Sequence, residues 1–290
     1  MNPLRLPLND ADARSLIQAH RQLEHPSFAG RLSSVVGTPI EMAMKLLPRP
    51  WCLRIQHAAE DGIGRALDVA VARTRNHAPS QNRDRRYQML GMASGAVGGF
   101  FGGPALLLEL PVTTTLMLSA IVDIARSHGE DADDLATRLA CMEVFALGGR
   151  SNLDDAAETG YYGLRLALEL PIASASRFLS RPGAAMSGDI PVLVNLIRAL
   201  AERFGVVLSQ KAVAEIIPII GAAGGAFINH VFIQHFQDMA HGHFTVRRLE
   251  RHYGPAIVRD AYERIGHHAN LRRTPALPNR RPARIGAVAA

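Results

Sequence analysis

The amino-acid sequence predicts an all-α protein, a multi-helix domain built around two helical segments with glycine-zipper spacing. Apolar residues recur at three- and four-residue intervals through most of the 290-residue chain, which is the period of a helix buried on one face. The period-two alternation that is typical of strands is missing from the sequence. Only 20% of the residues are charged and 48% are hydrophobic, so the composition favours a folded core over disorder.

The expected organisation has three parts. Residues 1–30 hold an N-terminal helix, residues 31–268 form the main α-helical domain with a polar break near 76–86, and residues 269–290 form a basic, flexible tail. Within the main domain, helices are expected at 58–72, 131–147, 152–170, 191–204, from 209 to an interruption at Pro218, 227–252 and 256–268.

Glycine and proline set the expected helix ends. Gly149 should stop the helix that begins at 131, and Pro171 should end the next one, because proline lacks the amide that a helix interior needs. Gly205 and Gly254 occupy positions typical of the residue that follows a helix.

The first glycine-rich segment spans residues 89–122 and carries one charge, Glu109. Four of its glycines recur at every fourth position, which lets a helix approach its partner to backbone contact. These glycines are Gly91, Gly95, Gly99 and Gly103.

The second segment, residues 216–236, carries no formal charge and contains Gly221 and Gly225. About 20 apolar residues suffice to span a bilayer, so both segments are long enough in principle. Each is interrupted by proline, at Pro104 and Pro218, as in re-entrant or packed hairpins.

The positive charge is concentrated in the tail. The net charge is +6, and all but two of the 32 basic residues are arginines. Most of the excess lies beyond residue 270, so nucleic-acid binding by the folded part is not expected, whereas contact of the tail with anionic lipid or another anion is. The tail residues assigned to this contact are Arg272, Arg273, Arg280 and Arg281.

Several chemistries are excluded by motif. Neither lysine follows the glycine loop of a P-loop, and the dinucleotide-binding, serine-elbow, HExxH and CxxC patterns are missing from the sequence. The two cysteines, Cys52 and Cys141, are expected as free thiols, and no cofactor is expected. The N-terminus does not read as a secretory signal, which favours a cytoplasmic location.

Four runs occur in a fixed order, and together they resemble the EcsC family of bacterial proteins. They are Glu109–Thr115, Asp123–Asp131, Pro218–Asn229 and His243–Glu250, and the resemblance covers about residues 50–262. It implies an α-helical, membrane-associated protein without an established activity, and it offers no catalytic residues to transfer. The family's namesake is encoded beside an ABC transporter in some bacteria, which implies an accessory role by analogy.

Glu109 is the most unusual residue, because an ionised carboxylate among leucines is costly unless it is paired or protonated. It could be an acid–base group or a polar anchor in a membrane cavity. The structural alternative, which we favour, has Glu109 accept hydrogen bonds from groups freed by a helix break at Pro111 or from the hydroxyls of Thr113–Thr115, or pair with an arginine of another helix. Asn229 and His243 are the other candidate site residues.

Four polar residues near the end of the second segment resemble a metal cluster at first sight. Asp238 and His241 alone have ligand spacing on one helix face, and zinc would need two more donors. We therefore expect no metal and interpret the group, His235, Asp238, His241 and His243, as a polar helix end.

The functional hypothesis is a membrane-associated accessory or interaction protein, linked to transport or secretion, at the cytoplasmic face of the inner membrane or partly inserted in it. Its partner would be a membrane surface or a membrane protein, and a homo-oligomer stays open. The alternative is a soluble, hydrolase-like enzyme with a pocket around Glu109 and His243. A third possibility is a soluble partner-binding protein whose glycine segments are its central helices.

Overall fold

The computed structural model describes residues 6–24, 28–37, 40–45, 47–74, 83–101, 103–149, 160–179, 190–216 and 221–273. All regular secondary structure in these ranges is helical, which confirms the all-α prediction. The helices are α1 (Asp10–Glu24), α2 (Phe28–Val36), α3 (Ile40–Met44), α4 (Arg49–Thr74), α5 (Arg83–Phe101), α6 (Gly103–Ser127), α7 (Leu135–Gly148), α9 (Tyr161–Leu179), α10 (Ile190–Ile216), α11 (Gly221–Tyr253) and α12 (Pro255–Arg273).

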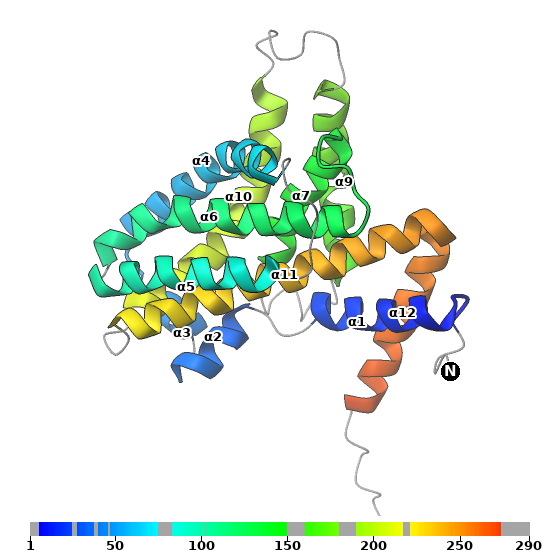
Figure 1. The fold of residues 1–290 in the computed structure, drawn as a ribbon, viewed down its shortest axis with the longest axis horizontal. Coiled ribbons are helices and arrows are strands. Elements are labelled where there is room, and N and C mark those ends of the chain that lie inside the picture. Colours follow the sequence, from blue (N-terminus) through cyan, green and yellow to red (C-terminus); the bar gives the residue numbers. More distant parts are fainter. Residues whose placement is uncertain are drawn as a thin grey trace, which may run out of the picture.

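The 33-residue helix α11 is the central helix of the molecule (Figure 1). Its N-terminal half packs against α5 and α6, which lie alongside it, and α5 makes its most extensive contacts with α11. Its C-terminal half contacts α1 and α12, at the end of the molecule away from the turn between α5 and α6. Helix α10 runs across this layer and contacts α4, α7 and α9. Helix α11 therefore carries Asn229 in the half that packs against α5 and α6, and His243 in the half that contacts α1 and α12.

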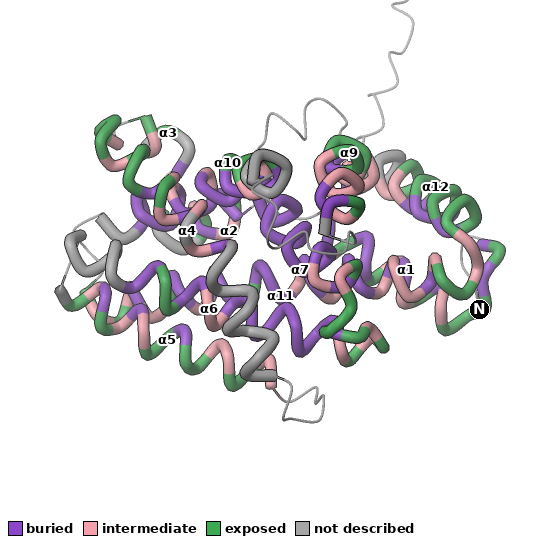
Figure 2. Tube along the Cα trace, turned by 90° about the horizontal axis from the view of Figure 1, so that it is seen from above, coloured by how far each residue is buried: buried purple, intermediate pink, exposed green. Residues whose placement is uncertain are grey.

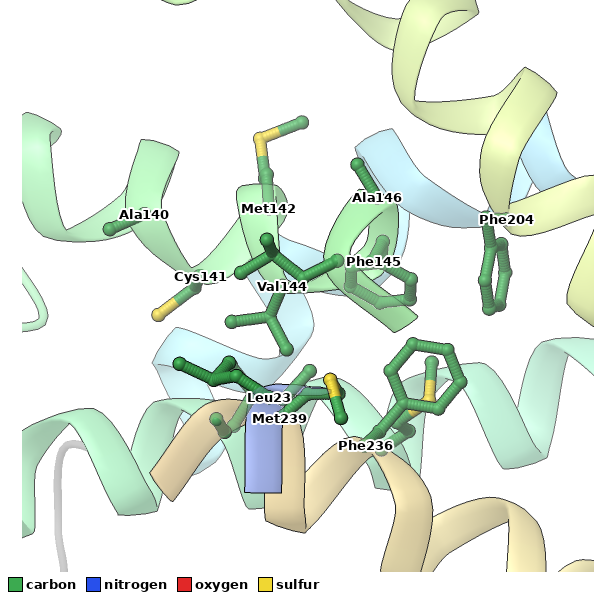
Figure 3. Packing of buried hydrophobic residues seen from close by; sticks show 14 of the residues in the cluster. Leu23, Ala140, Cys141, Met142, Val144, Phe145, Ala146, Phe204, Phe236 and Met239 are labelled. Carbon is green, nitrogen blue, oxygen red and sulfur yellow. The ribbon is translucent and has the colours of Figure 1, made fainter. Parts of the chain in front are cut away.

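Aromatic side chains fill the core between α7, α10 and α11 (Figure 3). The rings of Phe145 and Phe204 meet edge-to-face with centroids 4.7 Å apart, and the ring of Phe204 meets that of Phe236 at 5.7 Å. Such edge-to-face pairs are favourable beyond the area they bury. This cluster holds α7 and α10 against the middle of α11.

Three predicted helix ends are wrong. Pro111 lies inside α6, Pro171 lies inside α9, and α10 continues through Gly205. A proline removes one intrahelical hydrogen bond and a glycine costs about 1 kcal/mol, but packing of the whole helix can outweigh either cost. Around Gly205, for example, Phe204 and Val207 are both buried, so packing favours an unbroken helix.

The predicted segment boundaries also shift. Helix α2 crosses the expected boundary at residue 30, and α12 extends to Arg273, so that Arg272 and Arg273 are helical. Arg280, Arg281, Pro218 and most of the predicted polar break lie outside the described residues. The first glycine-rich segment is divided between α5 and α6. Among the described helices, none combines the length and the apolar character that crossing a membrane requires.

Candidate functional site

Helices α5 and α11 approach each other to backbone contact at glycines. A Cβ atom at Gly95 would overlap the carbonyl oxygen of Gly225, and one at Gly99 would lie 3.0 Å from the Cα of Gly225. The carbonyl of Gly221, a residue with φ of +42°, also faces Gly99. Because real Cβ atoms almost never come this close, larger residues would push the helices apart. Gly103 begins α6, and its surroundings lie outside the described side chains.

This close approach brings Asn229 of α11 to the centre of a buried polar cluster. Its Nδ2 donates to the carbonyl of Gly91 at 2.9 Å and to Oε1 of Glu109 at 2.5 Å. The same Oε1 accepts from the Thr113 hydroxyl at 2.7 Å and from Nζ of Lys211 at 2.9 Å. We call the group of Glu109, Thr113, Lys211 and Asn229 the Glu109 centre. Its hydrogen bonds link α6, α10 and α11 with one another and with α5.

The Glu109 centre is sealed from solvent, since all four side chains are buried. Oε2 of Glu109 and Oδ1 of Asn229 have no hydrogen-bond partner among the described residues. Oε2 instead faces Gly98, where a Cβ would lie only 2.7 Å away. The ammonium of Lys211 also lies 5.4 Å from the ring centre of Phe232, within cation–π range.

The electrostatics favour an ionised Glu109. Burial by itself would raise the pKa of Glu109, but the charge of Lys211 and the hydrogen bonds from Lys211, Thr113 and Asn229 outweigh it, so the pKa lies below its ordinary value. A general acid needs the opposite shift. The geometry therefore supports the structural interpretation of Glu109, with Lys211 in place of the arginine that the sequence suggested.

His243 lies in a second, separate cluster, the His243 cluster, together with Tyr161, Glu143 and Arg165. His243 is 14 residues beyond Asn229 on the same helix, about 21 Å along the axis. Its Nδ1 lies 2.9 Å from the hydroxyl of Tyr161, and its Nε2 lies 3.7 Å from Oε2 of Glu143, which is longer than a hydrogen bond. The structure brings Glu109 and Asn229 together but does not bring His243 to them.

Burial is the main cause of the shifted pKa values of Glu143 and His243 in this second cluster. It raises the pKa of Glu143 to about 7, against the opposing charges of Arg165 and Arg247. It holds the pKa of His243 well below its ordinary value, and the same two arginines act in the same direction. Arg165 donates to Glu250 at 2.8 Å and lies 3.8 Å from Glu143. Near neutral pH the pair therefore consists of a neutral imidazole and a partly protonated carboxyl.

The four residues considered as metal ligands have different partners. His235 lies 2.9 Å from the carbonyl of Gly148, Asp238 pairs with Arg31 at 2.7 Å, and His241 pairs with Asp84 at 2.8 Å. In the part of the chain that the structure describes, no three metal-ligating side chains gather.

The arginines at the C-terminal end of α11 are also paired. Arg247 and Arg251 both bind Glu130, and Arg248 lies 3.2 Å from Asp12. These contacts join α11 to α1 and to the loop after α6. They act between helices instead of forming a free basic patch.

The outer face of α5 is a feature that the sequence reasoning missed. Helix α5 lies at the outer edge of the molecule (Figure 2). Opposite the glycines that face α11, four large apolar side chains are exposed. Advancing 100° per residue, these positions fall on one side of the helix and the glycines on the other, which is the signal that could have revealed them. The outer face consists of Met89, Leu90, Val97 and Phe100, whereas Met92, the least exposed of the exposed large apolar residues of α5, lies beside the glycines.

Together, the fold and its buried centres define an all-α protein in which long helices are joined by charged groups in the core. Comparison with protein families identifies the family to which this all-α protein belongs. The chain belongs to the EcsC protein family, whose sequence profile matches residues 65–249, well over half of the chain. The match contains both buried clusters and all of α5, and it is narrower than the resemblance expected from the motifs. Comparisons with curated proteins and with solved structures gave no match.

Proposed function

We propose that this protein is a membrane-associated accessory protein that docks on a bilayer through the outer face of α5. The observation that carries the proposal is the exposed apolar stripe on that helix. Phe100 is 73% exposed and Met89 is 69% exposed, and both lie on the same side of α5. Contiguous exposed apolar surface of this kind commonly marks a membrane or protein contact.

The inner face of α5 explains why the helix can present such a stripe without losing its position. Its glycines hold it against α11 by backbone contact, and Asn229 donates to its Gly91 carbonyl. Most of the large exposed side chains of α5 can therefore lie on the outer side. A helix with this arrangement buries its apolar face at the boundary between headgroups and acyl chains.

An accessory role for a membrane protein in transport or secretion, at the cytoplasmic face of the inner membrane, is the finer part of the proposal. It depends on the family resemblance alone. The two glycine-rich segments, considered as a glycine zipper, would supply a rigid support for the docking face. The hydrolase alternative has less support from the geometry, because Glu109 and His243 belong to separate buried clusters.

The test compares two double variants that lose similar exposed apolar surface. Val97→Ser/Phe100→Ser alters the outer face of α5, and Leu166→Ser/Leu170→Ser alters α9, where Leu170 is 75% exposed. The readout is the fraction of full-length protein that floats with phosphatidylcholine vesicles. We expect the α5 variant to lower partitioning about tenfold or more, since a deeply buried large apolar side chain contributes about 1.5–3 kcal/mol.

The α9 variant should partition like the wild type. Equal losses in the two variants would contradict docking through α5. Failure of the wild-type protein to float with any vesicle would contradict membrane association itself.

A further inference from the structure

Two arginines extend the outer face of α5 toward its N-terminus. At 100° per residue, Arg85 and Arg86 fall on the same side of the helix as Met89 and Phe100, and both are exposed. Neither is within ion-pair distance of a carboxylate in the described part of the chain. This side of α5 therefore combines an apolar stripe with two cations that have no acidic partner among the described residues.

Their neighbours in the first turn are already paired. Arg83 lies 3.0 Å from Asp123, and Asp84 pairs with His241. The hydroxyl of Tyr87 also donates to Asp123 at 2.7 Å. These contacts secure the start of α5 to α6 and α11, so Arg85 and Arg86 extend from a well-held turn. They differ in this from Arg247, Arg248 and Arg251, whose charges are neutralised by acids.

The charge of this surface indicates its partner. All acidic residues of α5 are accounted for by Asp84, which is paired, so the exposed side carries only positive charge. A cationic, apolar helix face is complementary to a membrane surface with negative headgroups above an apolar interior. We propose that Arg85 and Arg86 form a binding site for anionic phospholipid headgroups, which selects acidic bilayers for docking by α5. This inference rests on the proposed function and adds the lipid class to it.

The experiment uses the full-length chain and two vesicle compositions. One is phosphatidylcholine alone, and the other contains about one third phosphatidylglycerol. The variant Arg85→Gln/Arg86→Gln is compared with Arg14→Gln/Arg264→Gln, which removes the same charge from exposed positions on α1 and α12. All variants keep the arginine-rich tail, so its contribution is common to each comparison.

We expect the wild type to prefer the acidic vesicles, and the α5 variant to lose about 10- to 30-fold in affinity for them, since each arginine near such a surface contributes about a fivefold factor. Its binding to phosphatidylcholine should not change, and the control variant should bind acidic vesicles nearly as the wild type does. Equal losses in both variants, or equal wild-type affinity for both vesicles, would overturn the headgroup site.

The two proposals fail in different ways. Binding that depends on Phe100 but not on Arg85 or Arg86 would retain α5 as the docking face and remove the headgroup site. Absence of binding to both vesicle types would remove the proposed function and this inference with it.

Discussion

Nζ of Lys211 lies 2.9 Å from Oε1 of Glu109, a residue 102 positions earlier in the chain, and both side chains are buried. Either charge alone would be costly at this place, because an unpaired ion in the interior loses its hydration without compensation. Together, and with the hydrogen bonds of Thr113 and Asn229, they hold three helices in one arrangement. The pair supports the position of α6 beside α5, the helix that we propose as the docking element.

Replacing Lys211 with methionine tests this interpretation of the pair. The Lys211→Met variant leaves Glu109 buried without its cation, so we expect the free energy of unfolding at pH 7 to fall by about 3–5 kcal/mol. Burial would then raise the pKa of Glu109 above its unfolded value, and the lost stability should be regained as the pH falls and the carboxyl becomes protonated. Urea unfolding at several pH values measures both effects.

The control is the double variant Glu109→Gln/Lys211→Met, which should be more stable at pH 7 than Lys211→Met alone. A loss of stability in Lys211→Met that does not depend on pH would show that packing, and not the charge of Glu109, causes it.

The glycine contact between α5 and α11 makes a second prediction. A Cβ at residue 95 meets backbone of α11, which cannot move like a flexible side chain, so Gly95→Ala should destabilise the protein by about 3 kcal/mol or more. Gly205→Ala is the matched control, because a Cβ there meets nothing within 4 Å and Gly205 lies inside α10. It should stabilise by about 0.5–1 kcal/mol. Thermal unfolding of both variants would reveal the opposite signs.

The His243 cluster predicts a particular dependence of stability on pH. The folded-state pKa of Glu143, about 7, lies above the ordinary value of 4.5, so its stabilising contribution is present below about pH 4.5 and is lost as the pH rises to about 7. His243 acts in the opposite sense, because its lowered pKa makes the folded state resist protonation below pH 6.5. Between pH 4.5 and 6.5 the two effects oppose each other.

Glu143→Gln removes only the carboxyl contribution. Relative to the wild type, its free energy of unfolding should therefore rise between about pH 4.5 and 7, by on the order of 3 kcal/mol. Chemical unfolding across this range measures the difference. A constant offset between the two proteins would mean that the pKa of Glu143 is not raised by burial.

The tail predicts a difference in salt dependence. Deleting residues 274–290 removes Arg280 and Arg281 but retains all of α12, so binding to acidic vesicles should weaken and become less sensitive to salt. Binding to phosphatidylcholine vesicles should persist, because it depends on the apolar face of α5. Vesicle flotation at low and high ionic strength would measure both, and loss of binding to neutral vesicles would contradict the role of α5.

Helical class, the family and the special status of Glu109 could all be predicted from the sequence. Helix periodicity is a property of neighbouring residues, and a lone carboxylate within an apolar run is visible without any structure. The regular spacing of Gly91, Gly95 and Gly99 likewise indicated a face that needs small residues. Helix ends were less predictable, because Pro111 and Pro171 break helices only where packing does not compensate.

The partners of the candidate residues depended on the tertiary structure. Local pattern predicts that a helix has an apolar side, but the packing of the whole chain decides which helix covers it. That packing placed Lys211 against Glu109 and placed His243 in a separate cluster beside Glu143. It also left the outer side of α5 exposed. Contacts between residues more than a hundred positions apart depend on the summed fit of many helices, and for this reason no short stretch of the chain encodes them.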